Sequence, residues 1–311
     1  DTERYRRSFE NIVKIDNVFN FLEYDTELFH KIFIKFINIF TNDFTFYLLI
    51  TATFIFVSLG IFIYKYSNDD FLSYVLFLTL GFFNFSFTGL RQTMAIIIIL
   101  LSYKFILNNN FFKFSITILI AFLFHSSAII FFPVYFISKI RWRIKNILIL
   151  VFSYILMIFL RNRFGYFFIN LYYDSKAGKV LNKYNTVGFI GERALLILLI
   201  IIFGIIILKP FKNDNEEHII LTNIMIFSFY IQSLSSYIYL FTRLNFYYFI
   251  FVIIYIPKIL NALVDKDLLP QKHIILFINV IRYLIIIVFF LYYFNNIDQG
   301  SGIIPYEFIW E

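Results

Sequence analysis

Three side chains stand where they could do chemistry within otherwise apolar sequence: His125, Arg91 and Arg243. His125 is the only histidine inside a long apolar stretch, and imidazole is the side chain that most readily carries a proton near neutral pH. Arg91 interrupts an apolar stretch over residues 71–107, and Arg243 interrupts another over 219–256. Because guanidinium groups bind phosphate or pyrophosphate through forked hydrogen bonds, these residues favour proton transfer beside a phosphate anion.

Each of the three residues also has a structural interpretation. A charge in the middle of a membrane costs several kcal/mol, which favours a cavity, a partner or a substrate around it. Arg91 and Arg243 could instead cap helix ends while their guanidinium groups reach the lipid headgroups. His125 could hold a bend by hydrogen bonding to the hydroxyls of Ser126 and Ser127.

The composition excludes several classes of protein. Of the 311 residues, 60% are apolar and 15% are charged, whereas soluble proteins average about 45–50% and about 25%. The net charge of +7 forms no continuous basic face, which argues against a nucleic-acid partner. The chain has no Cys, no metal-ligand spacing and no phosphate-binding glycine loop, so neither a metal nor a cofactor is expected. The remaining histidines fall in amphipathic or loop positions and are expected to be solvated: His30, His218 and His273.

The elements that must position these residues are long apolar segments, and about 20 apolar residues suffice for a helix that crosses a bilayer. Nine such segments are predicted, over residues 44–64, 71–90, 92–107, 114–138, 146–160, 194–208, 219–239, 244–256 and 274–294. We therefore predict an all-α polytopic integral membrane protein with about nine to ten helical membrane segments. Residues 1–311 are expected to form a single membrane domain.

The distribution of Lys and Arg indicates the orientation of these segments. The cluster Lys139, Arg141, Arg143 and Lys145 is typical of the cytoplasmic side, but one crossing by residues 114–138 would place it outside. We therefore predict that residues 114–138 form a re-entrant hairpin that bends near His125. Two long loops, 1–43 and 161–193, then lie on the outer side.

Both outer loops are rich in basic residues, which indicates either anion binding or loops long enough to escape the charge rule. The first loop contains an amphipathic helix over residues 27–40, which is expected to lie in the outer membrane interface. The basic residues of the whole first loop, 1–43, are Arg4, Arg6, Arg7, Lys14, Lys31 and Lys35.

Two motifs resemble the EpsG family of Wzy-like exopolysaccharide and O-antigen polymerases. The sequence TGLRQTMA over residues 88–95 resembles the "RQ" helix of that family, and AFLFHSSA over 121–128 resembles its A-x-x-x-H-x-S-A segment. The D-x-x-x-Y pattern from Asp1 to Tyr5 resembles the start of an outer loop, which one further span normally precedes. Two shorter matches fit the same pattern, Thr242-Arg243 and Ile304-Pro305-Tyr306.

The resemblance implies a polymerase in the bacterial inner (cytoplasmic) membrane, with its active site on the outer or periplasmic side. Such an enzyme moves a growing glycan from one undecaprenyl-pyrophosphate carrier onto a lipid-linked repeat unit. The expected partners are undecaprenyl-pyrophosphate-linked glycans, the lipid bilayer, and the flippase and chain-length regulator of the same pathway. No nucleic acid is expected.

Site residues follow from the motifs together with the resemblance. His125 is the expected proton acceptor, with Asp1 as the second candidate, and Arg91 and Arg243 are expected to stabilise the leaving pyrophosphate. The expected substrate-binding residues are Asp1, Tyr5, Gln92, Arg161 and Arg193.

Two other functions remain open at this point. A lipid-linked oligosaccharide flippase would also place cations in a membrane cavity, but such proteins often contain internal repeats, and no convincing repeat is found here. A membrane O-acyltransferase that acts on glycans would also combine a histidine with an arginine. It would need a cytoplasmic route for acyl-CoA, whereas His125 lies on the outer side in the predicted topology.

Overall fold

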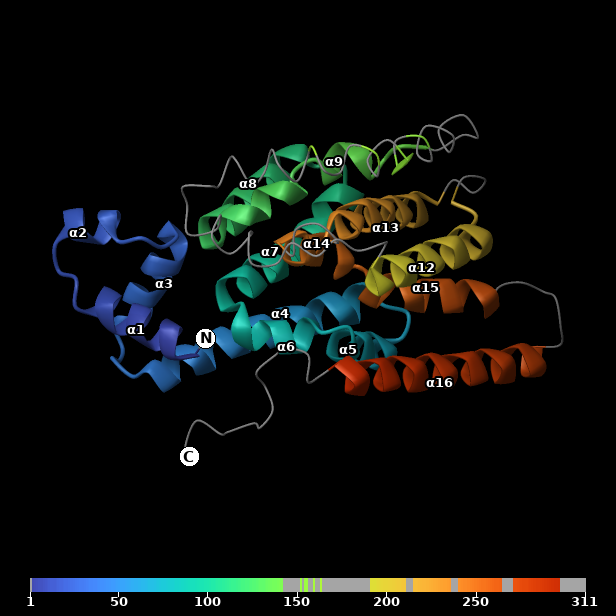
Figure 1. The fold of residues 1–311 in the computed structure, drawn as a ribbon, viewed down its shortest axis with the longest axis horizontal. Coiled ribbons are helices and arrows are strands. Elements are labelled where there is room, and N and C mark those ends of the chain that lie inside the picture. Colours follow the sequence, from blue (N-terminus) through green and yellow to red (C-terminus); the bar gives the residue numbers. More distant parts are fainter. Residues whose placement is uncertain are drawn as a thin grey trace. The chain divides into compact units, whose positions relative to one another are not determined.

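The structure is a computed structural model that describes residues 2–141, 191–210, 215–235, 240–264 and 271–296, with a few isolated positions between 152 and 163. Within these ranges every regular element is a helix and no strand occurs, so the all-α prediction is confirmed (Figure 1). The chain divides into two compact units. The first contains Asp1–Phe132 and Leu263–Glu311, and the second contains Pro133–Ala262.

The first unit begins with three short helices that precede the first long one. They are α1 (Thr2–Val13), α2 (Val18–Glu23) and α3 (Leu28–Asn38). The helix predicted over residues 27–40 is thus confirmed as α3, which begins directly after Glu27. A hydrophobic core joins α1 and α3 to the start of α4 (Phe44–Tyr66), and it consists of Phe9, Ile12, Ile34, Ile37, Phe44 and Tyr47.

Two lysines of α3 bind the backbone at the ends of α1 and α2. The ammonium group of Lys31, which is only 3% exposed, donates to the carbonyl oxygens of Phe21 (2.8 Å), Leu22 (3.0 Å) and Tyr24 (3.1 Å). Lys35 donates to the carbonyl oxygen of Val13 at 3.0 Å. The last carbonyls of a helix have no partner within the helix and carry partial negative charge, so a cation satisfies them. These two lysines are therefore occupied by the protein's own backbone, which argues against anion binding by these two residues of the first loop.

Three helices of the described chain are long and apolar enough to cross a membrane. They are α4, α7 (Leu90–Leu107) and residues Leu276–Asn295 of α16 (Gln271–Asn296). The number rises to five if each of two bent helix pairs counts as one span. The predicted nine to ten segments are therefore not confirmed. Most of the predicted span 146–160 lies outside the described residues.

The span predicted over residues 71–90 is not one continuous helix, and its two halves count either as one bent span or as a re-entrant loop. The chain forms α5 (Asp70–Thr79) and α6 (Phe82–Thr88), which are bent by 55° relative to each other. The break falls at Gly81, whose φ of 87° lies in the left-handed region that glycine adopts without a steric penalty. Hydropathy alone could not reveal this break, because apolar residues continue on both sides of it.

The chain also breaks at His125, as the sequence predicts. Helix α8 (Phe111–Phe124) ends there in an extended residue (φ −157°), and the 3₁₀-helix η1 (Ser126–Phe131) follows. The ring centroid of Phe132 lies 5.9 Å from that of Phe111, at the start of α8. Because α8 is about 20 Å long, this contact requires the chain to turn back along the helix. The placement of this turn in a membrane stays a prediction.

An ion pair holds α16 against α5, and no pattern in the sequence indicates it (Figure 1). Arg282, in the interior of α16, places Nη2 2.9 Å from Oδ1 of Asp69 and Nε 2.6 Å from Oδ2. The same carboxylate caps the first turn of α5 by accepting from the N–H of Leu72. A charge within an apolar helix is thus paired rather than left exposed to lipid.

The second unit contains α12 (Glu192–Leu208), α13 (Glu216–Leu234), α14 (Leu240–Phe249) and, up to Ala262, α15 (Val252–Val264). Buried polar side chains join α13 to α14. Ser228 Oγ donates to Asn245 Oδ1, and Asn245 Nδ2 donates to Gln232 Oε1, both at 2.8 Å. Such internal pairing is required where no water is present to satisfy polar groups.

The carbonyl contacts of α3 predict different stabilities for two matched variants. Lys31→Met removes three charge-assisted hydrogen bonds and should lower the free energy of unfolding by roughly 2–4 kcal/mol. Lys35→Met removes a single one and should cost less. Thermal unfolding of the purified protein in detergent, followed by circular dichroism, compares the two. Equal shifts in melting temperature would show that the three carbonyl contacts of Lys31 add no stability.

Candidate functional site

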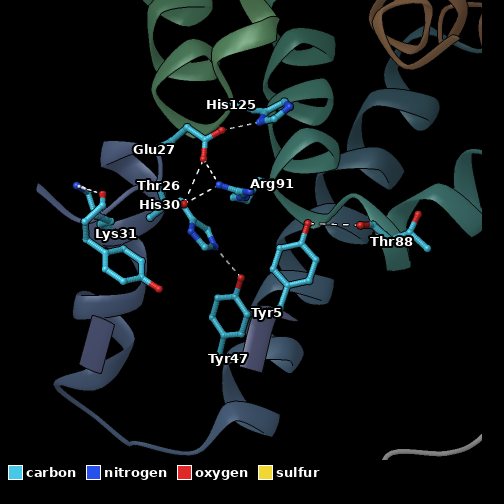
Figure 2. Close-up of polar contacts among 10 residues, drawn as sticks. Tyr5, Thr26, Glu27, His30, Lys31, Tyr47, Thr88, Arg91 and His125 are labelled. Carbon is cyan, nitrogen blue, oxygen red and sulfur yellow. Dashed lines mark hydrogen bonds and ion pairs between the residues drawn. The ribbon is translucent and has the colours of Figure 1, made fainter. Parts of the chain in front are cut away.

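Three helix ends of the first unit bring together Glu27, Arg91 and His125 (Figure 2). Glu27 is the N-cap residue of α3, and Arg91 lies in the first turn of α7. His125 is the residue that ends α8. Glu27 is separated from Arg91 by 64 residues of sequence and from His125 by 98. The site is therefore assembled entirely by the fold.

The Glu27 carboxylate holds both of the other side chains, one with each oxygen. Arg91 donates from Nη1 to Oε2 of Glu27 and to Oγ1 of Thr26, the latter at 2.6 Å. His125 Nδ1 lies 2.7 Å from Oε1 of Glu27. The side chains of Glu27, Arg91 and His125 are 16%, 22% and 26% exposed, so the cluster is largely enclosed but keeps some exposed surface.

The electrostatics of the cluster keep Glu27 ionised. Burial raises the pKa of its carboxyl, but the hydrogen bond from His125 and the positive charge of Arg91 outweigh burial and lower this pKa from 4.5 to about 2. Since a carboxylate can only accept, Nδ1 of His125 carries the proton of their hydrogen bond. In the neutral imidazole the lone pair then lies on Nε2, for which the described part of the chain offers no hydrogen-bond partner.

His30 lies buried beneath this cluster, so the expectation that it is solvated is wrong. It is 1% exposed, and its Nε2 lies 3.0 Å from the hydroxyl of Tyr47 (Figure 2). Burial lowers the pKa of His30 to about 3, and the charge of Arg91 acts in the same direction, so this imidazole is neutral. His30 shares the inner face of α3 with Ile34 and Ile37, which pack in the core.

His218 and His273 were also expected to be solvated. His218 is half-buried rather than solvated, which corrects its prediction. The side chain of His273 lies outside the described residues.

Two of the predicted substrate-binding residues lie close to Arg91 in the chain or in space. The hydroxyl of Tyr5 donates at 3.5 Å to the carbonyl oxygen of Thr88, the last residue of α6 and three residues before Arg91 (Figure 2). Gln92 follows Arg91 on α7 and is buried. Two further predicted residues, Asp1 and Arg161, lie outside the described residues.

Arg243 and Arg193 both belong to the second unit. Arg193 places its guanidinium carbon 5.8 Å from the ring centroid of Phe246 on α14. Arg243 precedes Phe246 by three residues, and residues three apart lie on the same face of a helix. Arg243 was expected between two spans, but it lies within the first turn of α14 and is exposed. Arg193, from α12, thus lies against the face of α14 that also carries Arg243.

Glu27 and Thr26 belong to the site, although no sequence pattern predicted them. Both stand in a polar stretch before an amphipathic helix, where an acid or a hydroxyl is ordinary. The one available signal was the position of Glu27 at the start of α3, which marks it as a residue that caps a helix.

The arrangement resembles a general base held by a carboxylate. The carboxylate fixes the imidazole ring and its tautomer, and Nε2 can accept a proton from a substrate hydroxyl. Arg91 adds a fixed positive charge next to that base. In the described part of the chain, no three His, Asp or Glu side chains are placed to hold a metal ion.

Comparison with known proteins identifies the family. No curated protein and no solved structure matches the chain. The model of the EpsG family matches residues 1–308, which is almost the entire sequence and includes both the Arg91 segment and the His125 segment. The chain therefore belongs to the EpsG family.

Proposed function

We propose that this protein is a membrane polysaccharide polymerase that joins undecaprenyl-pyrophosphate-linked repeat units at the outer face of the bacterial cytoplasmic membrane. Membership of the EpsG family supports a polymerase-like function in polysaccharide biosynthesis, and the long apolar helices support a membrane location. The observation that carries the proposal is the contact of one carboxylate, Glu27, with both an arginine and a histidine.

In the proposed reaction a hydroxyl oxygen of the lipid-linked acceptor attacks the anomeric carbon of the growing glycan. A new glycosidic bond forms while the bond from that carbon to the pyrophosphate oxygen breaks. The hydroxyl proton passes to Nε2 of His125, and the electron pair of the broken bond leaves with undecaprenyl pyrophosphate. The pyrophosphate is already an activated leaving group, so the transfer needs no nucleotide.

Glu27 acts as a positioning residue for this base. Its hydrogen bond to Nδ1 keeps the lone pair of His125 on Nε2, and its negative charge stabilises the imidazolium that forms as the proton is accepted. The low pKa of Glu27, about 2, means that this charge is present throughout the neutral pH range. The carboxylate itself does not take the proton.

Arg91 is oriented by the same carboxylate and is proposed to stabilise the leaving pyrophosphate. Its Nη1 is bound to Glu27 and Thr26, whereas Nη2 and Nε have no hydrogen-bond partner among the described residues. These two donors suit phosphate oxygens, and a preorganised cation stabilises negative charge as it develops. We also propose that Arg243 binds an anionic group of the lipid-linked substrate and that Arg193, whose guanidinium group lies against Phe246 of α14, contributes to substrate binding.

The remaining assignments complete the proposal. Asp1, Tyr5, Gln92 and Arg161 are proposed to bind the glycan or the pyrophosphate. The partners are lipid-linked glycans in the bilayer, together with the flippase and the chain-length regulator of the same pathway.

His125→Gln tests the proton acceptor. Glutamine can still hydrogen bond to Glu27 but cannot accept a proton near neutral pH. We expect a normally inserted protein that elongates lipid-linked repeat units at least about 10²-fold more slowly, the usual contribution of a positioned base. Turnover of purified protein, normalised to folded material, provides the measurement. If the wild-type protein leaves single repeat units unextended, the proposed function is wrong. If the Gln variant is as active as the wild type, His125 is not the proton acceptor.

Arg91→Lys tests the geometry of the anion contact. An ammonium group keeps the charge but cannot hold Glu27 and present two further donors in a fork, so we expect only short glycan chains. Gel analysis of chain length in a deletion strain that carries each variant at equal expression gives the readout. Wild-type chain lengths from the Lys variant would show that Arg91 acts only through its positive charge.

A further inference from the structure

Helix α3 has three faces, and one of them is apolar yet exposed. The inner face packs in the core through Ile34 and Ile37. A second face packs on α8, where the rings of Phe29 and Phe33 lie 5.8 and 6.3 Å from that of Phe124. The third face carries Leu28 (38% exposed), Ile32 (47%) and Phe36 (57%), and the turn after α3 adds Ile39 (76%) and Phe40 (68%). We call these five residues the α3 stripe.

The α3 stripe is continuous with the charged cluster. Its first residue, Leu28, follows Glu27 directly, and Figure 2 shows Glu27 pointing at Arg91 from the start of α3. The stripe follows a spacing of four residues from Leu28 to Phe40, and α3 is about 16 Å long. An apolar track of this length therefore ends at a guanidinium group whose Nη2 and Nε have no hydrogen-bond partner among the described residues.

From this continuity we infer that the α3 stripe binds the first isoprene units of the lipid carrier, with the carrier pyrophosphate at Arg91. The inference rests on the proposed function and adds a subsite to it. A polyprenyl pyrophosphate has a long apolar chain on a compact anion, which matches an apolar stripe that leads to a cation. Both parts of the ligand are then recognised by side chains of one unit.

Bulk membrane lipid is the competing occupant, and α16 provides the comparison. Its exposed apolar side chains, such as Ile287 and Leu291, are 54% and 59% exposed, similar to those of the α3 stripe. The described charge on that helix, Arg282, is already paired with Asp69. A surface of this kind suits any acyl chain. The α3 stripe differs because it leads to available donors for an anionic headgroup.

The experiment compares two carriers on matched variants. Lipid-linked repeat units with the same glycan and pyrophosphate are prepared on undecaprenyl and on a carrier of two isoprene units. Ile32→Ala/Phe36→Ala shortens the α3 stripe, and Ile287→Ala/Leu291→Ala is the control on α16. We expect the first variant to raise KM for the undecaprenyl substrate about tenfold, since two partly buried apolar contacts are lost, with kcat retained. The short carrier, which reaches only the start of the α3 stripe, should show a much smaller rise, and the control variant should show no change.

Three outcomes would overturn the inference: an equal loss on both carriers, an unchanged KM for the undecaprenyl substrate, or an equal effect of the α16 control. A binding measurement separates the inference from the proposed function. Undecaprenyl pyrophosphate without sugar should bind purified wild-type protein about tenfold more tightly than it binds Ile32→Ala/Phe36→Ala. This difference supports the subsite even if no glycan is elongated, and equal affinities would contradict it.

Discussion

The ionised carboxylate of Glu27 is the interaction on which the site depends. A negative charge that is only 16% exposed must be compensated, and here Arg91 and His125 compensate it from two other segments of the chain. The carboxylate in turn sets the tautomer of His125 and the direction of Arg91. Removal of any one partner would leave a partly buried polar group unsatisfied, so the three residues form a single electrostatic unit.

The surrounding structure holds this carboxylate in place. Lys31 lies one turn after Glu27 and ties the end of α2 to α3, so the segment that carries Thr26 and Glu27 cannot move independently of the helix. Below them, His30 and Tyr47 join α3 to α4 through a buried hydrogen bond. The neutral imidazole of His30 adds no charge that would compete with Arg91 for the carboxylate.

The sequence predicted those site residues that are polar or charged within a long apolar run. Arg91 and His125 were identified because each interrupts a long apolar run, and the bend at His125 followed from the charge distribution. Glu27 stands in a polar stretch and does not interrupt an apolar run. Its partners lie 64 and 98 residues away, so no local pattern could connect them. His30 was misjudged because α3 is apolar on more than one face, and periodicity alone cannot show which face is buried. The break at Gly81 and the pair between Arg282 and Asp69 depend on backbone conformation and tertiary contact, which hydropathy does not report.

The central claim is that Glu27 acts through His125, and a double-mutant cycle tests it most directly. Turnover of lipid-linked repeat units is measured for wild type, Glu27→Gln, His125→Gln and the double variant, each normalised to folded protein. If the two side chains act as one unit, Glu27→Gln slows the wild type at least about tenfold but has little further effect in the His125→Gln background. Independent losses that multiply in the double variant would contradict the account.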